Sequence, residues 1–287
     1  MRINRAILAL TAAGLTWGLT VPMSKVVLDW LDPAWTTVAR FGLAAPVLAA
    51  VAWGRLRANT TPTVLMWGAV GFGMVIVLQN IGIARTSVTH AALILGTVPI
   101  LVALTTAAAG RGNAGPQAWA GFAVALSGMA LVAGSGGTAS ISGDLIMLAS
   151  AALSALTIEA QSRLLPGRDP IAVTAVQMAA AAVAVLPLAL LAGELPTGGP
   201  TLAQAVNGIG LITLGSLLPF ALYAYGQKHV PAEVAGAFVN LEPLVGAGLG
   251  AAVFGEPFGG LGAAGGVAVV AGIALSALAP GPALTPG

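Results

Sequence analysis

The sequence contains no cysteine and very few charged residues. Its 287 residues include no Cys, two His and only 7% Asp, Glu, Lys and Arg, whereas soluble domains carry roughly 25% charged residues. The absence of Cys excludes a disulfide framework, a thiol nucleophile and a thiolate metal site. Two His cannot form a zinc site without additional carboxylate ligands. The sequence therefore predicts no metal, no cofactor and no catalytic residues.

The basic residues form no cluster. Eleven Lys and Arg, with a formal net charge of +2, are scattered singly or in pairs, which argues against a nucleic-acid surface. A Gly-x-x-x-x-Gly-Lys-Ser/Thr loop and a soluble domain to hold it are also missing, so nucleotide-driven pumping is not supported.

Apolar residues are abundant and come in blocks. They make up 57% of the chain, and a membrane-spanning helix needs about 20 of them in succession. We therefore expect an all-α membrane protein whose partner is the lipid bilayer. Ten helices are predicted, over residues 6–28, 33–54, 63–84, 88–109, 115–134, 142–164, 170–192, 203–226, 231–254 and 258–279.

The loops between these blocks predict helix starts and an orientation. Asp32-Pro33 and Asp169-Pro170 each place a capping carboxylate before a proline at the first helical position. Cytoplasmic loops of membrane proteins are enriched in Lys and Arg, and a cytoplasmic N-terminus puts most of the basic residues on that side. Both termini are therefore predicted to be cytoplasmic. The basic residues concerned are Arg2, Arg5, Arg55, Arg57, Arg111, Arg163, Arg168 and Lys228.

The two halves of the chain resemble each other. An offset of 144 residues pairs Pro99 with Pro243, and an offset of 137 residues pairs the two Asp-Pro steps. We expect a five-helix repeat at 1–137, a second at 138–279 and a disordered tail at 280–287. An odd number of spans per repeat places the copies in opposite orientations around a central cavity. Glycines at the larger offset add support: Gly82 and Gly226, Gly121 and Gly265, Gly128 and Gly272.

An inverted repeat favours a carrier over other classes of membrane protein. One half can rock against the other and expose a site near the membrane midplane to each side in turn. Pro99 and Pro243 are candidates for gating because the repeat places them at equivalent depth, although helix bending for packing is the alternative interpretation.

Several short motifs occur in the order typical of one family. They include Thr16-Trp17-Gly18, Val38-Ala39-Arg40-Phe41, Leu241-Glu242-Pro243-Leu244 and Gly255-Glu256-Pro257. With them, the chain resembles an EamA-type member of the drug/metabolite transporter superfamily, and among these the bacterial aromatic amino-acid exporters of the YddG type. The resemblance implies ten helices in two inverted five-helix repeats, a cavity lined by helices 1, 3, 4, 6, 8 and 9, and a location in the bacterial inner membrane.

Polar residues inside the predicted spans are the candidates for substrate binding, since such groups are expensive in lipid. Glu242 either hydrogen-bonds backbone freed by Pro243 as the neutral acid or faces a wet cavity as a proton or cation site. His90 begins the fourth helix, and the resemblance favours the cavity over a solvated helix cap. The predicted cavity residues are Trp17, Gln79, Asn80, His90, Asn240 and Glu242.

Other ionisable and aromatic residues receive structural interpretations. Arg40 is expected to pair with Asp29 or Asp32, with binding of a substrate carboxylate as the alternative. Glu159 is expected to pair with Arg163, four residues further along the helix. Two tyrosines near the cytoplasmic end of the eighth predicted span, Tyr223 and Tyr225, are interpreted as anchors at the membrane interface.

The sequence predicts a secondary transporter of amino acids and related small metabolites that works as a monomer by alternating access. A multidrug or other metabolite carrier of the same fold is the first alternative. An intramembrane enzyme is the second, but the few polar residues in the spans show no spacing typical of catalytic groups. We therefore do not expect an enzyme.

Overall fold

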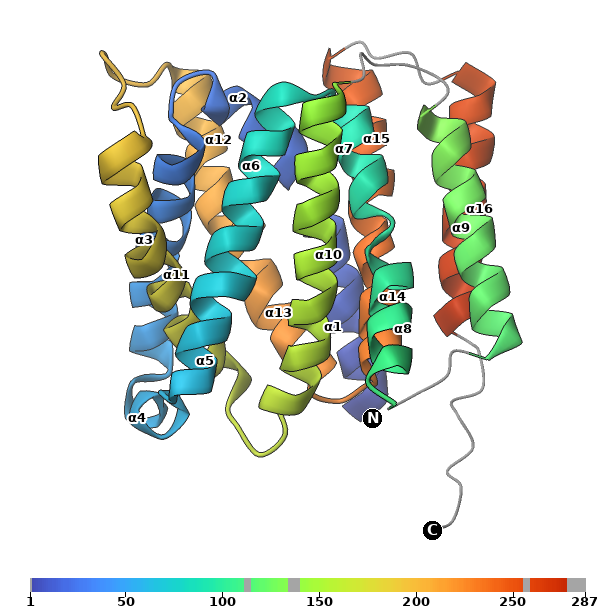
Figure 1. Ribbon diagram of the computed structural model, residues 1–287, viewed down its shortest axis with the longest axis horizontal. Coiled ribbons are helices and arrows are strands. Elements are labelled where there is room, and N and C mark those ends of the chain that lie inside the picture. Colours follow the sequence, from blue (N-terminus) through green and yellow to red (C-terminus); the bar gives the residue numbers. More distant parts are fainter. Residues whose placement is uncertain (1, 111–114, 134–139, 255–258, 278–287) are drawn as a thin grey trace.

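The computed structural model describes residues 2–110, 115–133, 140–254 and 259–277, and within these ranges all regular structure is helical. The helices run side by side and antiparallel in one bundle (Figure 1). The tail predicted at 280–287 lies outside the described residues.

The first half of the chain forms a series of helical segments, several of them joined end to end. Its elements are α1 (Arg2–Trp17), α2 (Thr20–Leu28), α3 (Pro33–Val51), η1 (Trp53–Arg55), α4 (Leu56–Asn59), α5 (Pro62–Trp67), η2 (Gly68–Met74), α6 (Val75–Arg85), α7 (Val88–Leu95), α8 (Val98–Ala108) and α9 (Pro116–Ala133).

The second half of the chain also forms a series of helical segments. Its elements are α10 (Ile141–Leu164), α11 (Pro170–Ala192), α12 (Leu202–Ile212), η3 (Thr213–Leu217), α13 (Leu218–Gln227), α14 (Ala232–Ala237), η4 (Phe238–Asn240), α15 (Leu241–Phe254) and α16 (Gly259–Ala277).

Seven helical runs in the described part of the chain are long and apolar enough to cross a membrane, and Val98–Ala108 is a shorter apolar helix. Helices occupy all ten predicted ranges, but the count of ten membrane spans stays a prediction. The seven runs are Ile3–Leu28, Pro33–Val51, Pro62–Arg85, Ile141–Leu164, Pro170–Ala192, Leu202–Gln227 and Gly259–Ser276.

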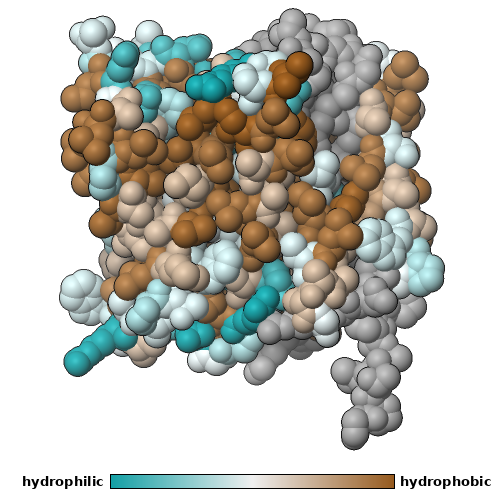
Figure 2. Space-filling model, viewed as in Figure 1, coloured by the Kyte–Doolittle hydropathy of each residue, from teal (hydrophilic) through white to brown (hydrophobic). Residues whose placement is uncertain are grey.

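The outer surface is apolar where a membrane would surround it. Val183 is 70% exposed and Leu191 is 88% exposed. Figure 2 shows hydrophobic residues across the middle of the bundle and hydrophilic residues gathered towards its two ends. Such a surface cannot be solvated by water without a large free-energy cost, which agrees with the all-α membrane protein expected from the composition.

The two Asp-Pro steps start helices as predicted. Asp32 accepts a hydrogen bond from the backbone N–H of Ala34 at 2.8 Å, at the beginning of α3. Asp169 accepts one from the backbone N–H of Ala172 at 2.9 Å, at the beginning of α11. Each carboxylate satisfies a donor that the helix itself leaves unpaired.

Irregular helical segments occur at matching places in the two halves. The π-helix η2 (68–74) and the π-helix η3 (213–217) are separated by the offset of 144 residues. The predicted span 88–109 is interrupted at Gly96 and Thr97, between α7 and α8, and the 3-10 segment η4 (238–240) interrupts the span 231–254 at nearly the same offset. These two departures from α geometry recur with the sequence repeat, whereas the break at Gly18 and Leu19 between α1 and α2 has no counterpart in the continuous helix α10.

Packing contacts follow the same pattern. A Cβ added at Gly71 in η2 would meet the Thr157 side chain, and one added at Gly215 in η3 would meet the Thr20 side chain. Thr20 and Thr157 are 137 residues apart, which is the second offset of the repeat. Each half thus packs its π-helix against the equivalent helix of the other half.

Helices α9 and α16 lie directly against each other. A Cβ added at Gly121 would lie 2.7 Å from the carbonyl oxygen of Gly272, and one at Gly128 would lie 2.5 Å from that of Gly265. The contacts are crossed, because each glycine meets the repeat equivalent of the other. Two antiparallel helices related by a twofold axis make contacts of this kind.

Candidate functional site

A cavity of about 110 Å³ lies between the two halves. A single water needs only ~10–15 Å³ of such volume, so the cavity has room for several water molecules. Both halves contribute to its wall. The lining residues are Trp17, Thr20, Arg40, Gly71, Phe72, Val75, Ile76, Gln79, Leu95, Val98, Ser154, Thr157, Ile158, Gln161, Phe220, Tyr223, Ala224, Gln227, Val239 and Glu242.

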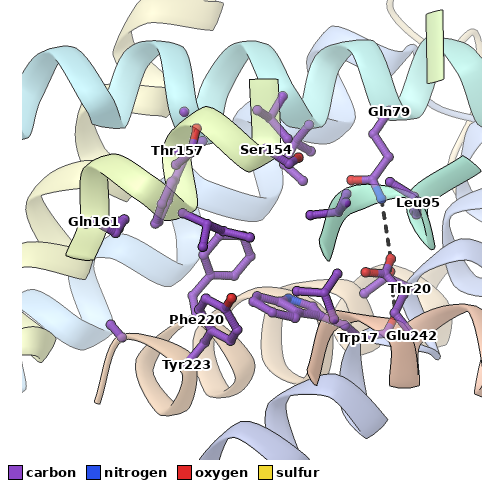
Figure 3. Close-up of a pocket in the computed structure, with 18 of the residues that line it drawn as sticks. Trp17, Thr20, Gln79, Leu95, Ser154, Thr157, Gln161, Phe220, Tyr223 and Glu242 are labelled. Carbon is purple, nitrogen blue, oxygen red and sulfur yellow. Dashed lines mark hydrogen bonds between the residues drawn. The ribbon is translucent and has the colours of Figure 1, made fainter. Parts of the chain in front are cut away.

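Aromatic rings form one part of this wall. The ring of Trp17, at the end of α1, lies 5.2 Å from that of Phe220 and 4.9 Å from that of Tyr223, centroid to centroid, and both partners belong to α13. Phe72 of η2 packs on Phe220 at 4.6 Å. Figure 3 shows Trp17 and Phe220 between two groups of polar side chains. The rings offer a flat apolar surface to a bound molecule.

The first polar group is centred on a buried carboxylate. Glu242, at the start of α15, is 6% exposed. Its Oε1 accepts hydrogen bonds from Thr20 Oγ1 and from Gln79 Nε2, both at 3.4 Å (Figure 3). Its Oε2 accepts none from any residue that the structure describes, so this oxygen is available to a ligand.

Arg40 adds a buried cation to the same cavity. Its Nε donates to Ser216 Oγ and its Nη2 to the carbonyl oxygen of Gly215, both at 3.0 Å. A guanidinium has five N–H donors, so three remain uncommitted. Arg40 and Glu242 interact electrostatically, so the same cavity holds a guanidinium and a carboxyl group that can be ionised.

The expected pairing of Arg40 with Asp29 or Asp32 is therefore wrong. Asp32 caps the first turn of α3, and a helix rises about 1.5 Å per residue. Arg40 lies eight residues further along, or about 12 Å, so its side chain reaches η3 of the other half instead. No local sequence signal identifies Ser216 and Gly215 as its partners.

The second polar group lies on the other side of the rings. Gln161 of α10 donates from Nε2 to Gln177 Oε1 of α11 at 2.8 Å. Gln227 of α13 donates from Nε2 to the carbonyl oxygen of Ile158 at 2.6 Å. Ser154 and Thr157 line the cavity nearby (Figure 3). This group contains amides and hydroxyls but no charge.

Tyr223 also belongs to the second group, so its interpretation as an interface anchor is wrong. It is 7% exposed and packs on Trp17. The repeat held a signal for this position, because the offset of 144 pairs Tyr223 with Gln79. Two polar side chains at equivalent positions, one in α6 and one in α13, indicate that both line the same cavity.

Of the predicted cavity residues, Trp17, Gln79 and Glu242 line the cavity. Asn80 is fully buried beside it and donates from Nδ2 to Thr37 Oγ1 at 3.1 Å, tying α6 to α3. Successive helical residues point about 100° apart, so a helix that turns Gln79 towards the cavity turns Asn80 away.

The remaining candidates lie close to the helix interruptions. Asn240 is buried in η4 and is not among the lining residues; its Oδ1 lacks a hydrogen-bond partner within the described ranges. Pro99 and Pro243 are buried, in the first turns of α8 and α15, which follow the two interruptions. His90 belongs to α7, but its side chain lies outside the described residues.

Glu159 has the structural role that the sequence predicts. Its Oε1 accepts from Arg163 Nη2 at 2.9 Å, and its Oε2 accepts from Thr106 Oγ1 at 3.1 Å. Neither carboxylate oxygen lines the central cavity. Across residues 2–110, 115–133, 140–254 and 259–277, no three His, Asp or Glu side chains gather as a metal site would require.

Known proteins resemble this chain along most of its length. The sequence model of the EamA-like transporter family matches residues 4–134 and again residues 141–278. A probable terminal-alkyne amino-acid exporter of Streptantibioticus cattleyicolor is 29% identical over 283 residues, which are 96% of this chain and 94% of that protein.

Further relatives are named as transporters. An uncharacterized transporter of Archaeoglobus fulgidus is 27% identical over 94% of this chain and 96% of its own. The uncharacterized inner membrane transporter YedA of Escherichia coli strain K12 is 27% identical over 86% of this chain and 82% of its own. One crystal structure superposes with a TM-score of 0.79 at 21% identity, covering 96% of this chain and 97% of that one, and shares the fold.

Proposed function

This chain belongs to the EamA-like transporter family and is a multi-pass membrane transporter, and we propose that it is a secondary transporter of amino acids and related small metabolites. It moves them across the bacterial inner membrane by alternating access, as an exporter or a facilitator.

The cavity between the two halves carries this proposal. Glu242 and Arg40 bring opposite charges to one small site, beside the aromatic surface of Trp17. An amino acid carries an ammonium and a carboxylate on one carbon and complements such a pair without adding net charge to the membrane interior. In the proposal, Glu242 Oε2 accepts from the ammonium and the free donors of Arg40 bind the carboxylate.

The other candidates support this site. Gln79 and Thr20 hold the carboxylate of Glu242 in place, and Asn80 fixes α6 against α3. We propose that His90 and Asn240 contact the substrate in another state of the transport cycle. Pro99 and Pro243, next to the interruptions that precede α8 and α15, are the proposed gating positions.

The proposed architecture has ten membrane spans in two inverted repeats, residues 1–137 and 138–279, within a functional monomer. The paired π-helices and the crossed glycine contacts of α9 and α16 support it. Repeats related in this way can exchange conformations, so that the cavity opens to each side in turn.

Flux measurements with the purified protein in liposomes test this proposal. Loaded unlabelled amino acids should accelerate the entry of labelled ones, and the label should be recovered chemically unchanged. An imposed pH gradient shows whether protons are coupled to transport. Exchange of unrelated drugs or sugars without exchange of amino acids would favour the alternative carriers, and conversion of the label would reveal an enzyme.

A further inference from the structure

The uncharged polar group of the cavity contains hydrogen-bonding atoms that no described residue satisfies. The hydroxyl of Tyr223 and Oε1 of Gln161 are buried and have no partner among the residues that the structure describes. Both residues line the cavity. Buried polar atoms are nearly always hydrogen-bonded, because an unpaired one costs free energy.

The unpaired atom of Gln161 does not depend on how its amide is oriented. Gln161 and Gln177 make one hydrogen bond to each other. Turning both amides over exchanges donor and acceptor but still gives one bond and leaves one polar atom of Gln161 unpaired. Gln177 is fully buried in α11, and its hydrogen bond fixes the position of the Gln161 side chain.

This group is separated from the charged one by aromatic rings. Figure 3 shows Glu242 with Gln79 and Thr20 on one side, Gln161 with Thr157 on the other, and Trp17 and Phe220 between them. The cavity therefore offers, in order, a charged end, a flat apolar surface and an uncharged end that both donates and accepts hydrogen bonds.

We propose that Gln161 and Tyr223 form a subsite that binds an uncharged polar group, such as a hydroxyl, at the far end of the substrate. This inference rests on the proposed function and narrows it. The favoured substrates have a charged head, an aromatic or apolar body and a neutral hydrogen-bonding group beyond it. A phenol fulfils the last two requirements, since its hydroxyl can donate to Gln161 and accept from Tyr223.

Binding of matched ligand pairs to the full-length protein in detergent tests the subsite. The pairs are tyrosine with phenylalanine, and tyramine with phenethylamine, and the readout is the dissociation constant from thermal shift. The hydroxylated member of each pair should bind about tenfold more tightly. Tyr223→Phe and Gln161→Leu should each reduce this ratio towards one without weakening the binding of phenethylamine.

Tyr225→Phe is the matched control, because Tyr225 is the other tyrosine of the chain, lies on the same helix and does not line the cavity. It should leave the ratio unchanged. The subsite would be overturned by equal binding within both pairs, or by ratios of dissociation constants that Tyr223→Phe and Gln161→Leu leave unchanged. The Tyr223 hydroxyl and Gln161 Oε1 would then bind ordered water only. Discrimination between the amines without binding of amino acids would retain the subsite and contradict the proposed amino-acid substrate.

Discussion

Glu242 and Glu159 are two buried carboxylates with different surroundings. Glu242 faces the cavity with one oxygen that accepts no hydrogen bond from the described residues, whereas Glu159 pairs with Arg163. Glu242→Gln keeps the shape but removes the charge that the proposed ammonium group requires. A charge-assisted hydrogen bond is worth about 1.5–3 kcal/mol, so amino-acid exchange at low substrate concentration should fall at least tenfold in liposomes.

Glu159→Gln provides the control for this measurement, because it removes a buried charge from another part of the same bundle. Because Glu159 does not line the central cavity, the exchange rate per inserted protein should stay within about twofold of the wild type. If Glu242→Gln also exchanges amino acids at the wild-type rate, Glu242 does not bind the ammonium group.

Gln79 and Asn80 are neighbours whose replacements should have separate effects. Asn80→Ala removes a buried hydrogen bond to Thr37 and should destabilise the protein by about 1–3 kcal/mol, observed as a lower unfolding temperature in detergent. The folded fraction should bind substrate with unchanged affinity. Gln79→Ala should weaken substrate binding with a smaller loss of stability. If Asn80→Ala weakened substrate binding and Gln79→Ala mainly lowered stability, Asn80 would belong to the substrate site.

The residues that could be predicted correctly are those whose environment is set locally. Asp32 and Asp169 cap helices because of the two or three residues that follow them, and Glu159 meets Arg163 one helical turn away. Arg40 and Tyr223 were misassigned because their partners come from the other half of the chain. Their positions depend on how the halves pack, which one sequence shows only through the repeat.

The sequence predicts one continuous helix over residues 63–84 and another over 203–226, and both contain a π-helical segment. Neither π-helical segment contains a proline. Each packs a glycine against a threonine of the opposite half, so close packing between the halves accompanies the irregular geometry. Pro219 follows η3 closely, as Pro99 and Pro243 follow the interruptions within residues 88–109 and 231–254. The helix α6 that follows η2 contains no proline, so only η2 lacks this sequence marker.

The contact between α9 and α16 predicts which glycines the fold requires. Gly121→Ala would place its Cβ 2.7 Å from backbone atoms of Gly272 and Ser276, and the two helices would have to separate. Overpacking of this kind costs about 1–3 kcal/mol, which a lower unfolding temperature in detergent would reveal.

Gly208 of α12 is the matched control for this substitution. A Cβ there meets nothing within 4 Å, and Ala favours a helix more than Gly by about 1 kcal/mol. Gly208→Ala should therefore leave the unfolding temperature unchanged or raise it. Equal stability of Gly121→Ala and Gly208→Ala would show that α9 and α16 are not closely packed in the membrane.

The end of the bundle at which the described chain begins carries exposed basic residues. Helix α1 begins at the end of the bundle where α4 lies and where α16 ends (Figure 1). Arg55 and Asp169 form an ion pair of 2.6 Å at that end, and Arg57 is exposed nearby. Because basic residues are retained on the cytoplasmic side, this end should face the cytoplasm and both termini with it.

Single cysteines can test this orientation directly, since the natural chain contains none. Ser142 and Glu194 are exposed at the end opposite Arg57. Ser142→Cys and Glu194→Cys should react with a membrane-impermeant maleimide in intact cells. Arg57→Cys and Arg168→Cys should react only after the membrane is permeabilised. The reverse pattern would place the termini outside the cytoplasm and contradict the assignment from charge, whereas labelling of all four positions in intact cells would show that the label crosses the membrane.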